Sequence, residues 1–267
     1  MAGTVFAEIL RRHWRQVLYW GLGIAVLIVY VLVVTADSEV LAGYAEMVAK
    51  FPPALMEMFG LDAETVGTIE GFLAFGVFTY SAIILAVYAI IAGLSITANE
   101  EDAGILDVVL SLPLPRWRVV LEKLAAYSVI LLGIVAIGCA VAVLRLQASE
   151  YQLDMGNLVQ SFLNLVPITM LIMAFTAFVA SLVRGRNTAA AIAAVFVIAS
   201  YLIDSLGGML GGQLAETLSR FSVFYYLDAE AVLRSGLVWT HVVGLLAVTG
   251  LLAAGSVWAF ERRDVGI

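Results

Sequence analysis

Six long apolar runs dominate the chain, and shorter polar segments separate them. Each run is long enough to cross a hydrocarbon layer of roughly 30 Å as a helix, which takes about 20 residues. The pattern therefore predicts an all-α membrane protein with six transmembrane helices, in one domain that covers residues 1–267. The predicted spans are residues 17–35, 72–98, 119–144, 158–183, 188–206 and 237–260.

The first 16 residues combine apolar and basic side chains at helical spacing. Ile9 and Leu10 belong to the apolar side, and three arginines belong to the other. We expect a separate amphipathic helix at residues 1–16, with its apolar side toward lipid and its arginines toward anionic headgroups. The alternative is a plain basic flank of the first span. Together with two arginines near the carboxyl end, the predicted interfacial anchors are Arg11, Arg12, Arg15, Arg262 and Arg263.

A polar and charged segment, Asn99–Lys123, separates the second and third spans. Asn99 can cap a helix whose first turn carries three carboxylates, which suit the positive end of a helix dipole. Apolar residues follow at helical spacing, and Pro113 and Pro115 end the helix. The segment therefore predicts a short amphipathic helix, held between two spans and suited to receive force from a soluble partner. Its acidic turn is Glu100, Glu101 and Asp102, and its apolar stripe is Ile105, Leu106, Val109 and Leu110.

The basic residues predict which side of the membrane is cytoplasmic. If both termini are inside, the inner segments hold ten basic residues and the outer segments hold four. Because basic residues concentrate on the cytoplasmic side, both termini are expected there. The inner residues are Arg11, Arg12, Arg15, Arg116, Arg118, Lys123, Arg184, Arg186, Arg262 and Arg263. The outer residues are Lys50, Arg145, Arg220 and Arg234.

The fifth span is rich in alanine and is followed by glycines. Small side chains let two helices approach closely in lipid, so we expect this span at the centre of a dimer. Ordinary packing against the chain's own helices is an equal alternative. The segment behind the span, residues 207–236, is too long and too apolar for a plain loop, and we expect one or two helices there at the outer interface. The dimer-interface candidates are Ala190, Ala194, Gly207 and Gly211.

The composition excludes several functional classes. The chain is 63% hydrophobic and 13% charged, which is too apolar for a soluble domain of this size. A net charge of −7 does not suggest a nucleic-acid partner. One cysteine and two histidines give no metal-ligand cluster at a recognisable spacing. A P-loop needs a lysine preceded by glycine, and neither Lys50 nor Lys123 has one, so the chain cannot bind ATP by that motif.

The central parts of the six predicted spans contain no Asp, Glu, Lys, Arg or His. Ion-coupled carriers usually place such a residue in the membrane as a relay, so this absence disfavours secondary transport. Glu122 and Lys123 lie at the inner mouth of the third span, and Asp204 lies near the outer end of the fifth. A transporter without a fuel site of its own must take its energy from elsewhere, and this points to a partner ATPase.

Motifs along the chain then narrow the interpretation. Between the second and third spans stand Glu100-Glu101, Gly104-Ile105-Leu106, Pro113 and Arg116, and the carboxyl end is Phe260-Glu261-Arg262-Arg263-Asp264. In this order on a six-span chain, they resemble the permease subunit of type 2 ABC exporters, the drug- and antibiotic-efflux kind. Members of that family commonly carry Gly-Thr-Leu where this chain has Ile105 in the middle position, and Pro115 is an extra helix breaker.

The resemblance implies a half-size permease that assembles as a homodimer, or with a close relative, together with two separate ABC ATPase subunits. ATP and Mg²⁺ would bind to the ATPase, and this chain would bind no cofactor. The complex would export a hydrophobic or amphipathic drug, antibiotic, lipid or peptide across the plasma membrane of a bacterium or archaeon. The coupling helix would dock on the ATPase through Glu100, Glu101, Gly104, Leu106, Leu110, Pro113 and Arg116.

Three other functions stay open at this point. The chain could be an ion-coupled secondary transporter, although its charge-free spans disfavour that. It could be a non-transporting membrane anchor for an ATPase. It could also couple ATP hydrolysis to uptake, although no docking feature for a binding protein is evident.

Overall fold

Six long helices make up most of the computed structural model, which describes residues 3–34, 43, 46–52, 68–98, 115–148, 153–210 and 217–262. All six are long and apolar enough to cross a membrane. No strand occurs within the described ranges. The predicted all-α membrane protein with six spans is therefore confirmed. The six are α1 (Thr4–Val34), a continuous helix of α5 (Ile69–Leu73), η1 (Ala74–Thr79) and α6 (Tyr80–Leu94), α9 (Arg116–Gln147), α10 (Met155–Leu182), α11 (Arg186–Leu210) and α14 (Trp239–Arg262).

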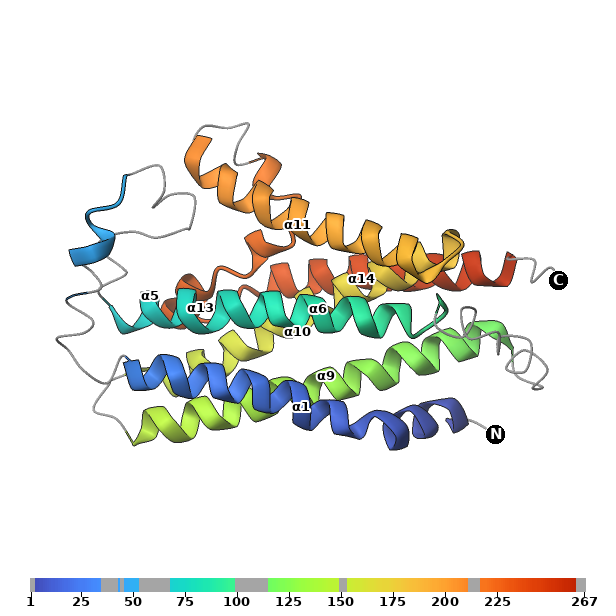
Figure 1. Ribbon diagram of the computed structural model, residues 1–267, viewed down its shortest axis with the longest axis horizontal. Helices are drawn as coiled ribbons and strands as arrows, with labels where there is room; N and C mark the ends of the chain where they lie inside the picture. The colour runs from blue at the N-terminus through green and yellow to red at the C-terminus, as the bar shows by residue number, and fades with distance from the viewer. Residues whose placement is uncertain are drawn as a thin grey trace.

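The helices run alternately in opposite directions along the long axis of the molecule (Figure 1). Both termini lie at one end, where α1 begins, α6 ends, α9 begins and α14 ends; we call it the basal end. The opposite end, where α1 ends and α9 ends, is the distal end. Between α11 and α14, the described chain is helical at residues 217–219, in η2 (Phe224–Tyr226) and in α13 (Ala229–Ser235). Helical structure was expected in this segment.

The first helix differs from the sequence expectation. We expected an interfacial helix at residues 1–16 separate from a span at 17–35, whereas the structure has one continuous helix of 31 residues. Nothing between Thr4 and Val34 breaks a helix, because this stretch contains no proline. At 1.5 Å per residue, α1 is roughly 46 Å long, about 16 Å longer than the hydrocarbon layer needs. Ile9 and Leu10, expected to face lipid, pack against the protein core instead.

Close glycine contacts pack α1 along α9. A Cβ atom added at Gly21 of α1 would lie 2.7 Å from the Ile137 side chain of α9. In the other direction, one added at Gly138 of α9 would lie 3.0 Å from the Ile24 side chain of α1. Small residues at a membrane helix interface let the backbones approach, and α1 and α9 use them from both sides.

The central helix of the bundle is α10, which contacts α6, α9, α11 and α14. It begins at Asp154, whose side chain caps the helix by accepting a hydrogen bond from the Asn157 amide at 3.0 Å. It continues through Pro167, where a kink was expected because proline removes one helical hydrogen bond. In contrast, α11 and α14 are the least buried of the six helices.

Candidate functional site

The basal end of α9 contains charged side chains at the border of the apolar bundle. Pro115 precedes the helix in an extended conformation, and Arg116 is its first residue. The predicted coupling helix, with Glu100, Glu101, Gly104, Leu106, Leu110 and Pro113, lies outside the described residues. The structure therefore describes the two anchor points of that segment, which are the end of α6 and the start of α9.

Glu122 of α9 caps the start of α1. Its Oε2 accepts hydrogen bonds from the Val5 amide at 3.0 Å and the Phe6 amide at 3.2 Å, and its Oε1 accepts from the Gly3 amide at 3.0 Å. These donors have no partner inside their own helix, because the first amides of a helix have no carbonyl before them. Gly3 precedes α1 and has no side chain that could cap it. The carboxylate from α9 takes over that role, and its charge suits the positive end of the α1 dipole.

Arg118 fixes the Glu122 carboxylate from the other side. Its Nε donates to Glu122 Oε1 at 2.7 Å, one helical turn earlier on α9. The side chains of Arg118 and Glu122 are 25% and 14% exposed, so water screens this pair less than it would a surface pair. Glu122 therefore holds one cation of its own helix and three amides at the start of α1.

Lys123 of α9 caps the end of α6. The residue is only 2% exposed, and its Nζ donates to the carbonyl oxygen of Ile96 at 2.9 Å and to that of Ser95 at 3.5 Å. Ser95 is the C-cap of α6. The last carbonyls of a helix lack intrahelical donors and carry the negative end of its dipole, so an ammonium group suits them. The two carbonyl oxygens provide acceptors for a buried ammonium group, which needs hydrogen bonds when it is taken out of water.

Two consecutive residues thus connect α9 to two other helices. Successive side chains on a helix point about 100° apart, so Glu122 can reach α1 while Lys123 reaches α6. Val119 and Val120, one turn earlier, are buried against the bundle. We call Glu122 and Lys123, with the backbone groups they bind, the basal clamp. It joins the two described ends of the 99–114 segment, because Lys123 belongs to α9 and its acceptors belong to the end of α6.

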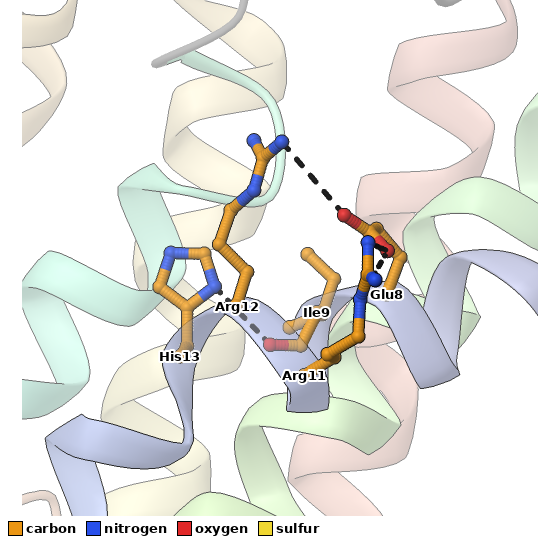
Figure 2. Close-up of polar contacts among 5 residues, drawn as sticks. All are labelled: Glu8, Ile9, Arg11, Arg12 and His13. Atoms are coloured by element: carbon orange, nitrogen blue, oxygen red, sulfur yellow. Dashed lines mark hydrogen bonds and ion pairs between the residues drawn. The ribbon is translucent and has the colours of Figure 1, made fainter.

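The basic side of α1 lies beside the basal clamp. Figure 2 shows Arg11 and Arg12 both reaching Glu8, at 2.8 and 3.8 Å. Their side chains are 80% and 73% exposed, so Glu8 neutralises only part of a charge that faces the surroundings. His13 instead donates from Nδ1 to the Ile9 carbonyl at 3.2 Å, and its ring lies 5.7 Å from that of Tyr127 on α9. This end of α1 has an arginine side and a side that packs on α9.

Nearly the whole chain matches the model of a protein family. The model of the ABC-2 family transporter proteins covers residues 6–265, from the start of α1 to beyond the end of α14. The chain belongs to this family. No curated protein matches it closely enough to be reported as a relative.

Family membership identifies the chain as a permease, an integral membrane subunit that works with an ABC ATPase subunit. The six spanning helices agree with that role. In the described part of the permease, no group of three or more His, Cys, Asp or Glu side chains is placed to hold a metal ion.

The other predicted site residues of the permease are spread over the bundle. Arg15 and Arg262 are exposed near the basal end, and the Arg262 guanidinium lies 4.3 Å from the centroid of the Trp258 ring. Arg263 and Gly211 lie outside the described residues.

One of the small residues of α11 packs within its own chain. Ala190 packs against a buried cluster that includes Leu94 of α6 and Ala180 of α10. Ala194 and Gly207 are half-buried, and the dimer interface stays a prediction.

Sequence reasoning located the two residues of the basal clamp but missed their role. Glu122 and Lys123 were recognised only as charges at the mouth of the third span. A usable signal was the rarity of lysine, since Lys123 is one of only two lysines in the permease. Their acceptors and donors, however, lie 27 to 119 residues away in sequence, where no pattern pairs them.

Proposed function

We propose that this permease is the membrane subunit of an ATP-driven exporter that moves a hydrophobic or amphipathic substrate, such as a drug, antibiotic, lipid or peptide, out of the cytoplasm. Two copies assemble with two separate ABC ATPase subunits, which hold ATP and Mg²⁺. The basal end faces the cytoplasm. The excess of arginine at this end supports that orientation, through the bias of basic residues toward the cytoplasm.

The observation that carries the coupling mechanism is the basal clamp. In this mechanism, residues 99–114 dock on the ATPase through Glu101, Leu106 and Leu110, and ATP binding moves the segment. Its two ends are the end of α6 and the start of α9, which Lys123 joins by hydrogen bonds. Glu122 joins the start of α1 to the same point of α9. A displacement of the segment therefore moves α1, α6 and α9 as one body against the rest of the bundle.

Such coupling has a thermodynamic requirement. The ATPase shifts the permease between two conformations only if its docking free energy differs between them. A rigid clamp supports that requirement, because it makes the position of the docking segment depend on the position of three spans. A loose connection would let the segment move while the spans stay in place.

Arginines at the basal end anchor this body to the inner leaflet. Arg11, Arg12 and Arg262 are exposed at the basal ends of α1 and α14. Each basic residue near an anionic membrane surface contributes about 1 kcal/mol of attraction. The anchors therefore hold the basal end at a fixed depth while the ATPase exerts force on it.

Leu106→Asp tests the docking assignment. A charge in the apolar stripe of the coupling helix removes apolar contact area and leaves an unpaired carboxylate at the interface. We expect the variant to fold and insert normally, but not to copurify with the ATPase or stimulate ATP hydrolysis. Leu218→Asp is the matched control, because Leu218 is 54% exposed in the segment between α11 and α14, outside the predicted docking segment.

The decisive comparison is between these two aspartates. If the ATPase docks on residues 99–114, the Leu106→Asp permease should purify without the ATPase. The Leu218→Asp permease should still purify with one ATPase copy per permease. If the ATPase stays bound and stimulated in Leu106→Asp, the docking assignment is wrong.

A further inference from the structure

A cleft of about 600 Å³ lies within the protomer, between α10, α11, α14 and residues 220–226. Its volume falls within the range of pockets that take one small ligand. None of its described lining residues belongs to α1, α6 or α9, the three helices that the basal clamp connects. The cleft is therefore separate from the basal clamp, and the coupling mechanism does not use it.

Hydrogen bonds from two spans hold one wall of the cleft in place. The Ser222 hydroxyl donates to the Ser200 carbonyl oxygen of α11 at 2.7 Å. Asn164 of α10 donates from Nδ2 to the carbonyl oxygens of Tyr226 and Leu227 at 3.0 and 2.7 Å. This wall is thus fastened to α10 and to α11, and the cleft has a defined shape.

The charged groups around the cleft do not select an ion. Among the described residues that line it there is no Asp, Glu or Lys, and Arg220 is the one arginine. Arg220 already interacts with another group of the chain. A cation would therefore find no carboxylate in this lining, and an anion would find no unengaged guanidinium. Because an ion taken out of water without a partner is costly, the lining favours an uncharged molecule.

The cleft has an aromatic floor and a polar mouth. Phe175 of α10 and Phe196 of α11 stack on the floor with ring centroids 4.1 Å apart. At the mouth, in the first turn of α14, Thr240 presents a hydroxyl and His241 a ring nitrogen, and neither side chain has a hydrogen-bond partner among the described residues. Leu252, eleven residues after His241, lies roughly 16 Å deeper at 1.5 Å per residue. A molecule that fills the cleft therefore meets hydrogen-bonding groups at one end and rings at the other.

The cleft is accessible from the side of the bundle. Two of its walls are α11 and α14, the least buried of the six helices. Figure 1 shows α11 diverging from α14 toward the distal end. Phe221, which lines the cleft, is 77% exposed. An apolar molecule dissolved in the surrounding membrane can therefore enter without crossing the bundle.

We propose that this cleft binds the cargo of the exporter, and that the cargo is an uncharged molecule with an apolar ring system and one hydrogen-bonding end. Its rings lie against Phe175 and Phe196, where aromatic groups prefer stacked or edge-to-face contacts. Its polar end lies at Thr240 and His241. A lipid tail would leave those two side chains unused, and a peptide would place unpaired backbone groups on the apolar floor. The role as cargo rests on the proposed export function, whereas the binding itself does not.

The test of binding is photo-crosslinking of the full-length permease in phosphatidylcholine nanodiscs, without the ATPase. Three probes share a phenyl ring that carries a trifluoromethyl diazirine. The first also carries a hydroxymethyl group, the second carries a carboxylate, and the third carries neither. Adducts on the floor, around Phe175, Phe196 and Leu252, are mapped by mass spectrometry of the digested protein. They are divided by the adducts at Leu22 of α1, whose 57% exposed side chain reports the concentration of each probe in the membrane.

We expect the hydroxymethyl probe to give several-fold more floor adducts than either of the other probes. The double variant Thr240→Val, His241→Phe keeps the size of both side chains but removes their hydrogen-bonding groups. It should lower the labelling by the hydroxymethyl probe about fivefold, as loss of one neutral hydrogen bond would. Thr188→Val is the matched control, because Thr188 is exposed near the start of α11 and does not line the cleft, and it should leave the labelling unchanged.

A pair of glycine variants tests the cleft itself and its role. Gly244 and Gly250 both lie on α14 with open space around an added Cβ atom, but only Gly244 lines the cleft. Gly244→Trp fills the cleft and abolishes the floor adducts, whereas Gly250→Trp keeps them. With the ATPase bound and without illumination, the hydroxymethyl probe should stimulate ATP hydrolysis in the wild type and in Gly250→Trp, but not in Gly244→Trp.

Four outcomes would overturn the proposal. Floor adducts that persist in Gly244→Trp would show that the labelling comes from the bulk membrane. Equal labelling by the carboxylate probe would remove the requirement for an uncharged molecule, and unchanged labelling of the double variant would remove the polar end. Specific labelling without stimulation, in a complex that hydrolyses ATP, would remove the role as cargo. A permease that binds no ATPase would contradict the export function instead, and the adducts would still decide whether the cleft binds the probe.

Discussion

Replacing Lys123 by methionine removes the ammonium of the basal clamp while keeping an unbranched apolar stem. Lys123 is 2% exposed and donates to the carbonyl oxygens of Ile96 and Ser95. Two effects then compete. Removing a buried charge also removes its desolvation penalty, whereas the carbonyl oxygens of Ile96 and Ser95 lose the hydrogen bonds that the ammonium donates, and the bond to Ile96 is a buried one.

The second effect should dominate, because the acceptors stay in place when only one partner is removed. A buried polar group left without a partner costs about 1–3 kcal/mol. We therefore expect Lys123→Met to lower the free energy of unfolding by about 2 kcal/mol. Lys123→Ala adds a cavity where the stem was, and should cost about 2–5 kcal/mol in total.

The assay is equilibrium unfolding of the full-length permease in mixed detergent micelles, followed by tryptophan fluorescence. Lys50→Met is the matched control, because Lys50 is the only other lysine and is exposed. Its change should stay within about 0.5 kcal/mol. The coupled readout is ATP hydrolysis with the partner ATPase, whose stimulation by the permease should fall in Lys123→Met more than in Lys50→Met.

The result that refutes this reasoning is a Lys123→Met variant as stable as Lys50→Met. Greater stability than the wild type would mean that the desolvation penalty of the ammonium exceeds its bonds to α6. If the variant also unfolds normally and stimulates ATP hydrolysis as the wild type does, the basal clamp has no role in coupling the permease to the ATPase.

Two further predictions concern helix packing. Gly93→Ala should lower the free energy of unfolding by about 1–3 kcal/mol, because the added Cβ would lie 2.6 Å from Thr176 Cβ. Thermal unfolding measures this loss, and Gly23→Ala is the control, because a Cβ atom added at Gly23 meets nothing within 4 Å. A loss in Gly93→Ala no larger than that in Gly23→Ala would contradict the prediction. The hydroxyls of Ser181 on α10 and Ser256 on α14 lie 2.9 Å apart and form a hydrogen bond. A double-mutant cycle with alanine at both positions should give a coupling energy of about 0.6 kcal/mol. If the stability losses of the two single variants add up to the loss of the double variant, the bond contributes nothing.

The positions of the six spans were predictable because a transmembrane helix is a local property of its sequence. The third apolar run, predicted at 119–144, became α9 at Arg116–Gln147. The helix is longer than its apolar run, because hydropathy marks the hydrocarbon layer and the helical hydrogen bonds continue past it. For the same reason, the boundary expected at residue 16 does not exist in α1, where a change from amphipathic to apolar character does not interrupt the backbone.

The candidate site was less predictable. Arg118 and Glu122 stand one turn apart, so their ion pair follows from helical spacing. That Glu122 also caps α1, and that Lys123 caps α6, depends on where those helices lie beside α9. A cleft between α10, α11 and α14 is likewise lined by Phe175, Phe196 and Leu252, each in a different span, and each alone resembles an ordinary apolar residue facing lipid.

The sequence by itself determined that the protein spans a membrane six times, with both termini at the same end and no P-loop for ATP. These conclusions need only the length, order and charge of segments, since every backbone group in lipid must be paired within its own helix. Only the tertiary structure decided which helix ends Glu122 and Lys123 cap, and which residues line the cleft between α10, α11 and α14. Those contacts join residues far apart in the chain, and they follow from how the small and apolar faces of neighbouring helices pack together.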